Sequence, residues 1–202
     1  MARAGQVIQG PHTAIVFVET SRDTHGVHLT FKQLVQPGSP ATPEHRHTEQ
    51  TEAFRVLAGK MGVRVGDLER VLGVGDSITV PAGVSHAMWN AGHEVLEQEI
   101  KLEPALNSET FFETVVGLEK DGQSPDGRPT FAQALQFALI GPYYRNPLGT
   151  MPLRLQRVLF ASLTPLALML GYRPWYPKYS PYGPVIPPRV RQGARQEVHH
   201  VK

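Results

Sequence analysis

Histidines and a glutamate stand at spacings that suit a metal ion. His45 and His47 are two positions apart, so on a strand both imidazoles project from the same face. Two ring nitrogens about 3 Å apart can occupy neighbouring positions around a metal at about 2.1 Å. Glu52 lies an odd number of positions beyond His47. We therefore expect a turn or bend through Thr48–Thr51 to return its carboxylate to the same side.

His86, the fourth candidate ligand, follows a short turn. Pro81 and Gly83 are typical of a tight turn, and His86 stands on the next predicted strand. Three imidazoles and one carboxylate suit Fe, Mn, Ni, Cu, Co or Zn. Ca and Mg instead prefer shells made of oxygen ligands. The residues therefore predict one divalent transition metal and leave its identity open.

The two stretches that carry these residues resemble the paired motifs of the cupin superfamily. The first reads Gly38-x6-His45-x-His47-x4-Glu52-x6-Gly59. The second reads Gly75-x5-Pro81-x-Gly83-x2-His86-x3-Asn90. The second motif fits at every position, whereas the first has one extra residue between Gly38 and His45, which lengthens a loop and removes no ligand. The resemblance covers roughly residues 25–103.

The resemblance implies a fold, a ligand set and an assembly. The fold is a jelly-roll β-barrel (the double-stranded β-helix) of six to eight strands with the metal inside its mouth, commonly in a homodimer. The ligands carried over are His45, His47, Glu52 and His86. The alternative is a cupin that keeps its shape and binds no metal. Because no ligand position is lost, we favour the metal-binding form.

The rest of the sequence pattern predicts a mainly β fold with a helical extension. Short β-type runs separated by turn residues predict strands at 12–20, 28–36, 53–59, 61–66, 76–81, 85–90 and 94–103. The period then changes, and helices are predicted at 107–120, 131–141 and 153–172, the second ended by Gly141-Pro142 and the third kinked or restarted near Pro165. We expect a barrel over 1–104, a helical extension over 105–172 and an extended or disordered tail over 173–202.

Alternation along the strands suggests substrate contacts inside the barrel. Phe31 and Gln33 share one face of the run 28–36, and Gln98 lies on the apolar face of 94–103. A lone glutamine on such a face is usually a hydrogen-bonded core residue, and the other interpretation is that it lines a ligand pocket. Met88 faces the metal side, with a core role as its alternative. We take Phe31, Gln33, Met88 and Gln98 as candidate substrate-binding residues.

Three carboxylates near the predicted metal have different interpretations. Glu52 is the candidate catalytic residue, since it could detach from the metal and serve as a base. Glu44 and Glu49 flank the histidines. They could act as general acid or base, but solvated loop carboxylates are the simpler interpretation.

Composition limits the classes of site and the location. The chain has no cysteine, which excludes disulfides, thiolate metal sites and cysteine nucleophiles. The first residues lack the apolar run of a secretory signal, so we expect a cytoplasmic protein. Charge is unevenly divided: residues 1–144 hold 11 Lys/Arg and 17 Asp/Glu, whereas residues 145–202 hold 9 Lys/Arg and one Asp/Glu. The basic part is a candidate for a separate role.

That basic part contains an uncharged stretch, Val158–Tyr172, which is too short to span a bilayer. Aromatic residues mixed with cations follow it over 172–179. One hypothesis is that residues 151–182 contact a membrane surface peripherally. The alternative is that the helix packs on the barrel or on a partner subunit. Nucleic-acid binding is not predicted, because the cations are spread out and interrupted by proline.

Three functions remain open. The leading prediction is a dioxygenase-type oxidoreductase that acts on a small, partly apolar organic molecule. The second is a metal-dependent isomerase or lyase that does not use O2. The third is a non-catalytic, metal-bearing module that binds a ligand. The sequence favours an enzyme and does not name the substrate.

Overall fold

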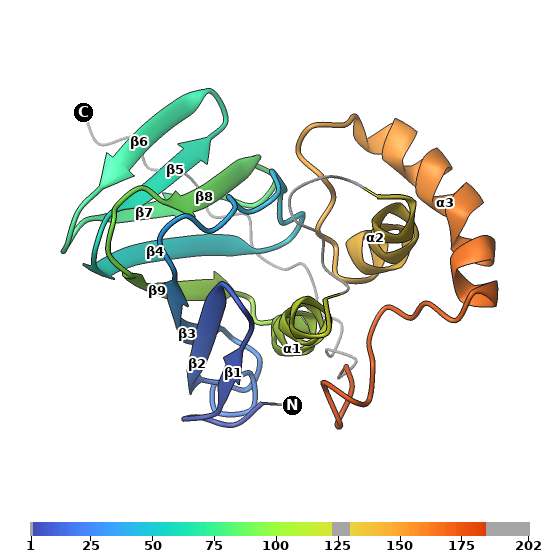
Figure 1. Cartoon of the computed structure of the whole chain (residues 1–202), viewed down its shortest axis with the longest axis horizontal. Coiled ribbons are helices and arrows are strands. Elements are labelled where there is room, and N and C mark those ends of the chain that lie inside the picture. Colours follow the sequence, from blue (N-terminus) through green and yellow to red (C-terminus); the bar gives the residue numbers. More distant parts are fainter. Residues whose placement is uncertain (1, 123–129, 185–202) are drawn as a thin grey trace.

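Nine strands in two antiparallel sheets make up the N-terminal half of the chain. The structure, a computed structural model, describes residues 2–122 and 130–184. The strands are β1 Val7–Gln9, β2 Thr13–Glu19, β3 Leu29–Val35, β4 Thr51–Ala58, β5 Met61–Val65, β6 Leu68–Leu72, β7 Ser77–Val80, β8 His86–Asn90 and β9 Leu96–Glu103. The larger sheet has the order β1-β2-β3-β9-β4-β7, and the smaller has the order β6-β5-β8 (Figure 1). This is the predicted mainly β, jelly-roll class.

Three helices follow the strands. They are α1 Ser108–Lys120, α2 Phe131–Tyr143 and α3 Leu153–Met169. In Figure 1, α3 forms the outer edge of the molecule on the side away from the sheets, and α2 lies between α3 and the sheets. Within residues 2–122 and 130–184, no helix is long and apolar enough to cross a membrane.

The hydrophobic core lies between the two sheets. Strands β3 and β9 pair in register with Phe31 opposite Ile100, so their alternate residues face inward together as predicted. Phe31 is fully buried, and its ring centroid lies 4.6 Å from that of Phe112 on α1. Helix α1 therefore packs on the core of the barrel, with Val116 also buried in it.

Predicted and observed strands agree apart from their ends and two omissions. All seven predicted strands are present, each within about two residues of its predicted bounds. The short strands β1 and β6 were not predicted. Among the described residues, β6 is an edge strand paired only with β5. Four of its five residues are exposed, so the run Leu68–Leu72 lacks an apolar face.

The helix predictions need two corrections at prolines. The predicted end of α2 at Gly141-Pro142 is wrong, because the helix continues to Tyr143. Pro142 removes only one backbone donor, and the amide of Tyr144 still donates to the carbonyl of Ile140 at 3.0 Å. Helix α3 does not restart at Pro165 but runs through it, and it ends at Met169 rather than at residue 172.

The tail is described only in part. Residues 173–184 form turns, and the carbonyl of Gly183 accepts a hydrogen bond from the buried Thr110 hydroxyl of α1. Residues 185–202 lie outside the described part of the chain. The division into 1–104, 105–172 and 173–202 stays a prediction, as does the homodimer.

Candidate metal centre

The segment 44–48 carries two of the candidate ligands and lies beside β8. The backbone amide of His45 donates to the carbonyl of His86 at 3.0 Å, and the amide of His86 donates back to the carbonyl of His45 at 2.8 Å. Gly83 adopts a φ of 85° in the turn that precedes β8, and its amide donates to the carbonyl of His47. The turn that the sequence predicts therefore fixes both histidine-bearing segments.

Glu52 reaches the same point from β4. The chain bends at Thr48 and Glu49, and β4 begins at Thr51. Within the sheet, Glu52 lies opposite Val80 on one side and Leu102 on the other, so its backbone is held from both sides. The predicted bend is confirmed.

The four donors converge. One ligand atom from each of His45, His47, Glu52 and His86 lies within 4.8 Å of the others. The Oε2 atom of Glu52 is 3.1 Å from Nε2 of His47 and 2.8 Å from Nε2 of His86. His47, Glu52 and His86 are buried, and His45 is half-buried. Three of the four donors are therefore shielded from water, and His45 lies nearer the surface.

Backbone carbonyls orient two of the imidazoles. Nδ1 of His45 lies 2.8 Å from the carbonyl oxygen of Pro43, and Nδ1 of His86 lies 3.1 Å from that of Val84. A carbonyl can only accept, so Nδ1 carries a proton in each ring, and Nε2 presents a lone pair whenever the ring is neutral. Histidines that bind metals commonly donate their second ring N–H in this way.

Burial and the neighbouring side chains shift the pKa values of three residues in the site. Burial lowers the pKa of His45 to about 4, helped by the neighbouring histidines. Burial opposes ionisation of Glu52, but hydrogen bonds from His47 and His86 hold the pKa of its carboxyl well below the usual range. Burial also opposes a charge on His86, yet the hydrogen bond to Glu52 raises the pKa of His86. The site therefore holds an ionised carboxylate at neutral pH.

This donor set fits a divalent transition metal. When the imidazole of His86 is neutral, with its proton on Nδ1, its Nε2 lone pair faces an ionised oxygen of Glu52 at 2.8 Å. Two electron-rich atoms at that distance need a proton or a cation between them. A metal bound by three imidazoles and one carboxylate satisfies both atoms, and it suits the borderline ions rather than Ca or Mg.

The candidate substrate residues lie in the barrel interior. Nε2 of Gln98 donates to Oε1 of Gln33 at 2.9 Å and lies 3.8 Å from Sδ of Met88. Gln98 is fully buried, and its Oε1 has no hydrogen-bond partner within the described residues. Phe31 packs in the core between Phe17 and Phe112. Their roles in substrate binding remain predictions.

The flanking carboxylates make structural contacts. Oε1 of Glu44 accepts a hydrogen bond from the Ser85 hydroxyl at 2.7 Å. Glu49 forms an exposed ion pair with Arg145. Both contacts join the ligand-bearing loop to other segments, and a role of either carboxylate as general acid or base remains a prediction.

The helical extension contributes an extended segment to the site, which the sequence did not predict. Residues 145–149, between α2 and α3, run antiparallel to 44–48, with Leu148 bridged to His45. The amide of Arg46 donates to the carbonyl of Pro147 at 3.1 Å, and the amide of Gly149 donates to that of Glu44 at 2.7 Å. The segment 44–48 therefore lies between β8 and the strap, our name for residues 145–149.

A buried glutamine of α3 holds the strap. The side chain of Gln156 accepts a hydrogen bond from the amide of Leu148 and donates to the carbonyls of Leu148 and Met151. No spacing rule marks this contact. The buried residues of α3 are Gln156, Phe160 and Ala167. A polar residue on this otherwise apolar face is the sequence feature that could have predicted the contact.

Comparisons with known proteins find similarity to a domain family and to two oxidoreductase-named proteins. A family profile described as "Cupin domain" matches residues 31–97. A curated protein of Arthrobotrys oligospora named as an oxidoreductase is 25% identical over 167 residues, which cover 76% of this chain and 64% of that protein. "Probable oxidoreductase virH" of Hypocrea virens is 28% identical over 171 residues, which cover 78% of this chain and 75% of that protein. Both alignments therefore extend beyond the barrel into the helices.

Solved structures are similar over about half of the chain. KdgF of Halomonas sp. is 15% identical, with a TM-score of 0.45 over 52% of this chain and 90% of that one. An RmlC-like cupin of Shewanella frigidimarina is 19% identical, with a TM-score of 0.43 over 52% and 88%. The family match, the two antiparallel sheets and both histidine motifs agree. Residues 31–97 of this chain therefore match a cupin domain, and the N-terminal half has the fold expected of one.

Proposed function

We propose that this cupin binds one divalent transition metal and carries out a dioxygenase-type oxidation of a small, partly apolar organic molecule. The ligands are His45, His47, Glu52 and His86. The observation that carries the proposal is the convergence of these four donors within 4.8 Å of one another. Such a metal, when bound, supplies Lewis-acid and redox chemistry.

The names of the relatives support an oxidoreductase. Both matched proteins carry that word in their names, at 25% and 28% identity. Because this chain spans 64% of the length of the first, the reaction itself belongs to the proposal.

The residues of the chain have distinct roles in this proposal. The buried side chains of Phe31 and Met88 exclude water from the interior. Oε1 of Gln98 is buried without a partner in the described part of the chain, so it can accept a hydrogen bond from a substrate hydroxyl, with Gln33 beside it. Oε2 of Glu52 is the atom that would take a proton from the substrate.

Metal content tests the site. The protein is purified without added metal, and elemental analysis compares wild type with His47→Ala and with His93→Ala, an exposed histidine of the β8–β9 turn. We expect about one metal per chain in wild type and His93→Ala, and loss of most of it in His47→Ala. One metal per chain retained in His47→Ala would contradict the proposed metal site.

Oxygen uptake separates the candidate reactions. Iron-loaded protein is given a panel of phenolic and enol substrates in an oxygen electrode. Consumption of O2 that depends on substrate and is lost in His47→Ala supports the dioxygenase-type reaction. Turnover under nitrogen indicates the isomerase or lyase, and binding without turnover indicates a non-catalytic ligand-binding module. A cytoplasmic location and a homodimer also remain proposals, the second testable by light scattering in solution.

A further inference from the structure

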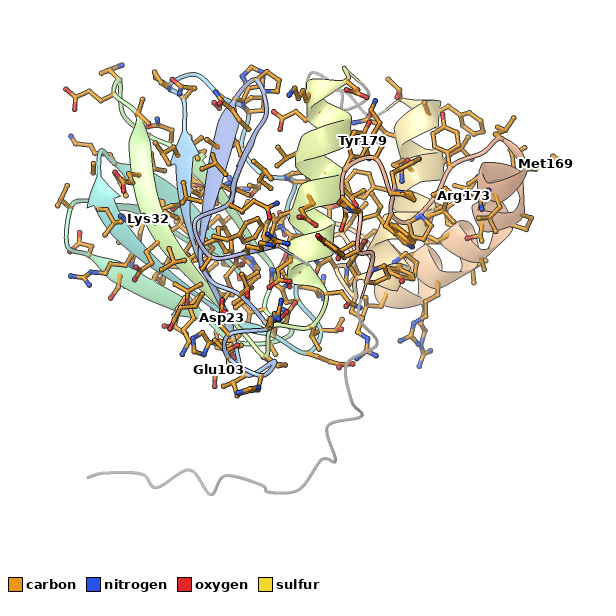
Figure 2. All side chains as sticks on the ribbon, turned by 90° about the horizontal axis from the view of Figure 1, so that it is seen from below. Asp23, Lys32, Glu103, Met169, Arg173 and Tyr179 are labelled. Carbon is orange, nitrogen blue, oxygen red and sulfur yellow. The ribbon has the colours of Figure 1, made fainter. Side chains whose placement is uncertain are left out.

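Helix α3 presents an apolar face that nothing within the described residues covers. Its exposed side chains include Leu155, Val158, Leu159, Met169 and, at the helix end, Leu170. Val158 is 70% exposed and Met169 is 78% exposed. Figure 2 shows Met169 and Arg173 at the end of the molecule opposite Lys32 of the barrel. This face therefore points away from the cupin domain.

The opposite face of the same helix is already used. Ala167 is buried against Leu135 and Leu139 of α2, and Phe160 is also buried. Leu155, Val158 and Met169 lie on the other side of the helix, because their spacing of three and eleven residues returns to nearly the same direction. The helix is thus apolar on both sides. A helix at the surface of a soluble domain normally has one apolar face toward the core and one polar face toward water.

The charged residues around the apolar face of α3 indicate what kind of partner could cover it. Residues 130–184 hold five Lys/Arg and no Asp/Glu. Arg145 pairs with Glu49 and Lys178 with Asp121, whereas Arg154, Arg157 and Arg173 have no ion pair within the described residues. Two of these arginines lie at the start of α3, and one follows its end. Cations thus stand at both ends of the apolar face.

We propose that this face of α3 binds the surface of an anionic lipid bilayer. An apolar helix face flanked by arginines lies in the plane of the interface, with its side chains in the acyl boundary and its cations at the lipid phosphates. The partly exposed Tyr172 and Trp175 follow the helix, where aromatic rings suit the headgroup level. At 17 residues, about 26 Å long, α3 is too short to span a bilayer.

A second copy of the chain fits the face less well. Pairing two α3 helices through it would bring the arginines of each helix toward those of the other, whether the helices run parallel or antiparallel. The helical part from 130 to 184 offers no carboxylate to pair with them. Like charges at the rim oppose such a dimer, and lipid phosphates complement it.

Vesicle co-sedimentation of the full-length protein tests this proposal. The probes are phosphatidylcholine vesicles with and without phosphatidylglycerol, at low and high salt. The variant is Val158→Asp, and the matched control is Val74→Asp, in the turn between β6 and β7 and 68% exposed. We expect wild type and Val74→Asp to bind the anionic vesicles at low salt, and Val158→Asp to bind about tenfold more weakly or not at all.

Each other outcome overturns the proposal. Wild type that stays in the supernatant with anionic vesicles has no such surface. Equal binding by wild type and Val158→Asp places the contact elsewhere. A dimer of wild type that Val158→Asp dissociates, without lipid binding, assigns the face to a second copy. Thermal unfolding of both aspartate variants checks that each remains folded, and the test does not depend on metal content.

Discussion

The barrel and the helical extension are stabilised by different interactions: strand pairing fixes the barrel, and helix packing fixes the extension. In the barrel, Glu52 and His86 lie on strands that pair along their length with neighbours on one or both sides. In the extension, α2 and α3 pack mainly on each other, through Leu135, Leu139 and Ala167. Within residues 2–122 and 130–184, the backbone hydrogen bonds between the extension and the ligand-bearing segment 44–48 all come from the strap.

This difference separates the supply of ligands from their positioning. All four candidate donors come from the barrel, so a barrel sequence motif can reveal them. The outer edge of segment 44–48, however, is completed by the strap, whose sequence carries no ligand. We therefore expect changes in the barrel core to alter global stability most, and changes at the strap to alter metal binding out of proportion to stability.

The largest effect is expected from Phe31→Ala. The ring is fully buried between Phe17 and Phe112, so its removal leaves a cavity that joins the barrel to α1. We expect the free energy of unfolding to fall by about 3–5 kcal/mol, measured by urea denaturation. The matched change in the extension, Phe160→Ala, should leave metal content intact. A loss below about 1 kcal/mol for Phe31→Ala would instead indicate an open pocket and favour substrate contact.

The strap is tested by Gln156→Ala. This change removes three hydrogen bonds and leaves backbone groups of Leu148 and Met151 unpaired. We expect a loss of about 2–3 kcal/mol in stability. We also expect metal affinity to fall about tenfold or more, the size seen when groups that orient ligands are removed. Competition with a chromogenic chelator measures the affinity.

A second glutamine provides the control. Gln136 on α2 donates to the carbonyl of Arg173 and accepts from the Tyr176 hydroxyl, away from segment 44–48. Gln136→Ala should destabilise the extension without changing metal affinity. If both variants weaken metal binding equally, the extension acts as a whole and the strap has no special role.

The sequence predicted that the four candidate donors converge, but it did not predict the segments that support them, for a physical reason. His45, His47 and Glu52 are close together in the sequence, and the turn at Gly83 depends only on the residues that form it. Rules about neighbouring residues are therefore enough to predict both. The pairing of Leu148 with His45 joins residues about a hundred positions apart through backbone atoms, which every residue type carries. The edge strand β6 was not predicted for a related reason. In the described structure it pairs on one side, and it has no alternation of apolar and polar residues that would indicate a strand.

Gly149→Ala examines the close approach of the strap. A Cβ at this position would lie 1.9 Å from Oγ of Ser85 and 2.8 Å from Cγ of Glu44. We expect a loss of about 1–2 kcal/mol, because the strap must move away from segment 44–48. Ser85→Ala removes the nearer atom, so the double variant should lose less stability than the sum of the two single variants. Strict additivity would show that the strap moves freely and does not press on the loop.

The smallest effect concerns α1, which belongs to the extension in sequence and packs on the barrel. Burial raises the pKa of Glu109, whose carboxylate accepts a hydrogen bond from the amide of Ser21 in a barrel loop. A carboxyl whose pKa is higher in the folded state contributes stability below its unfolded pKa and loses it as pH rises through the folded pKa.

Glu109→Gln should therefore make the protein slightly more stable at neutral pH, because the amide oxygen can keep the bond to Ser21 without a buried charge. The gain should vanish below about pH 4, where the unfolded wild-type carboxyl is also protonated. Thermal unfolding from pH 4 to 8 measures it, with the exposed Glu94→Gln as control. A variant less stable than wild type at every pH would mean that the charge itself joins α1 to the barrel, so that the boundary between the two regions would lie after α1 and not before it.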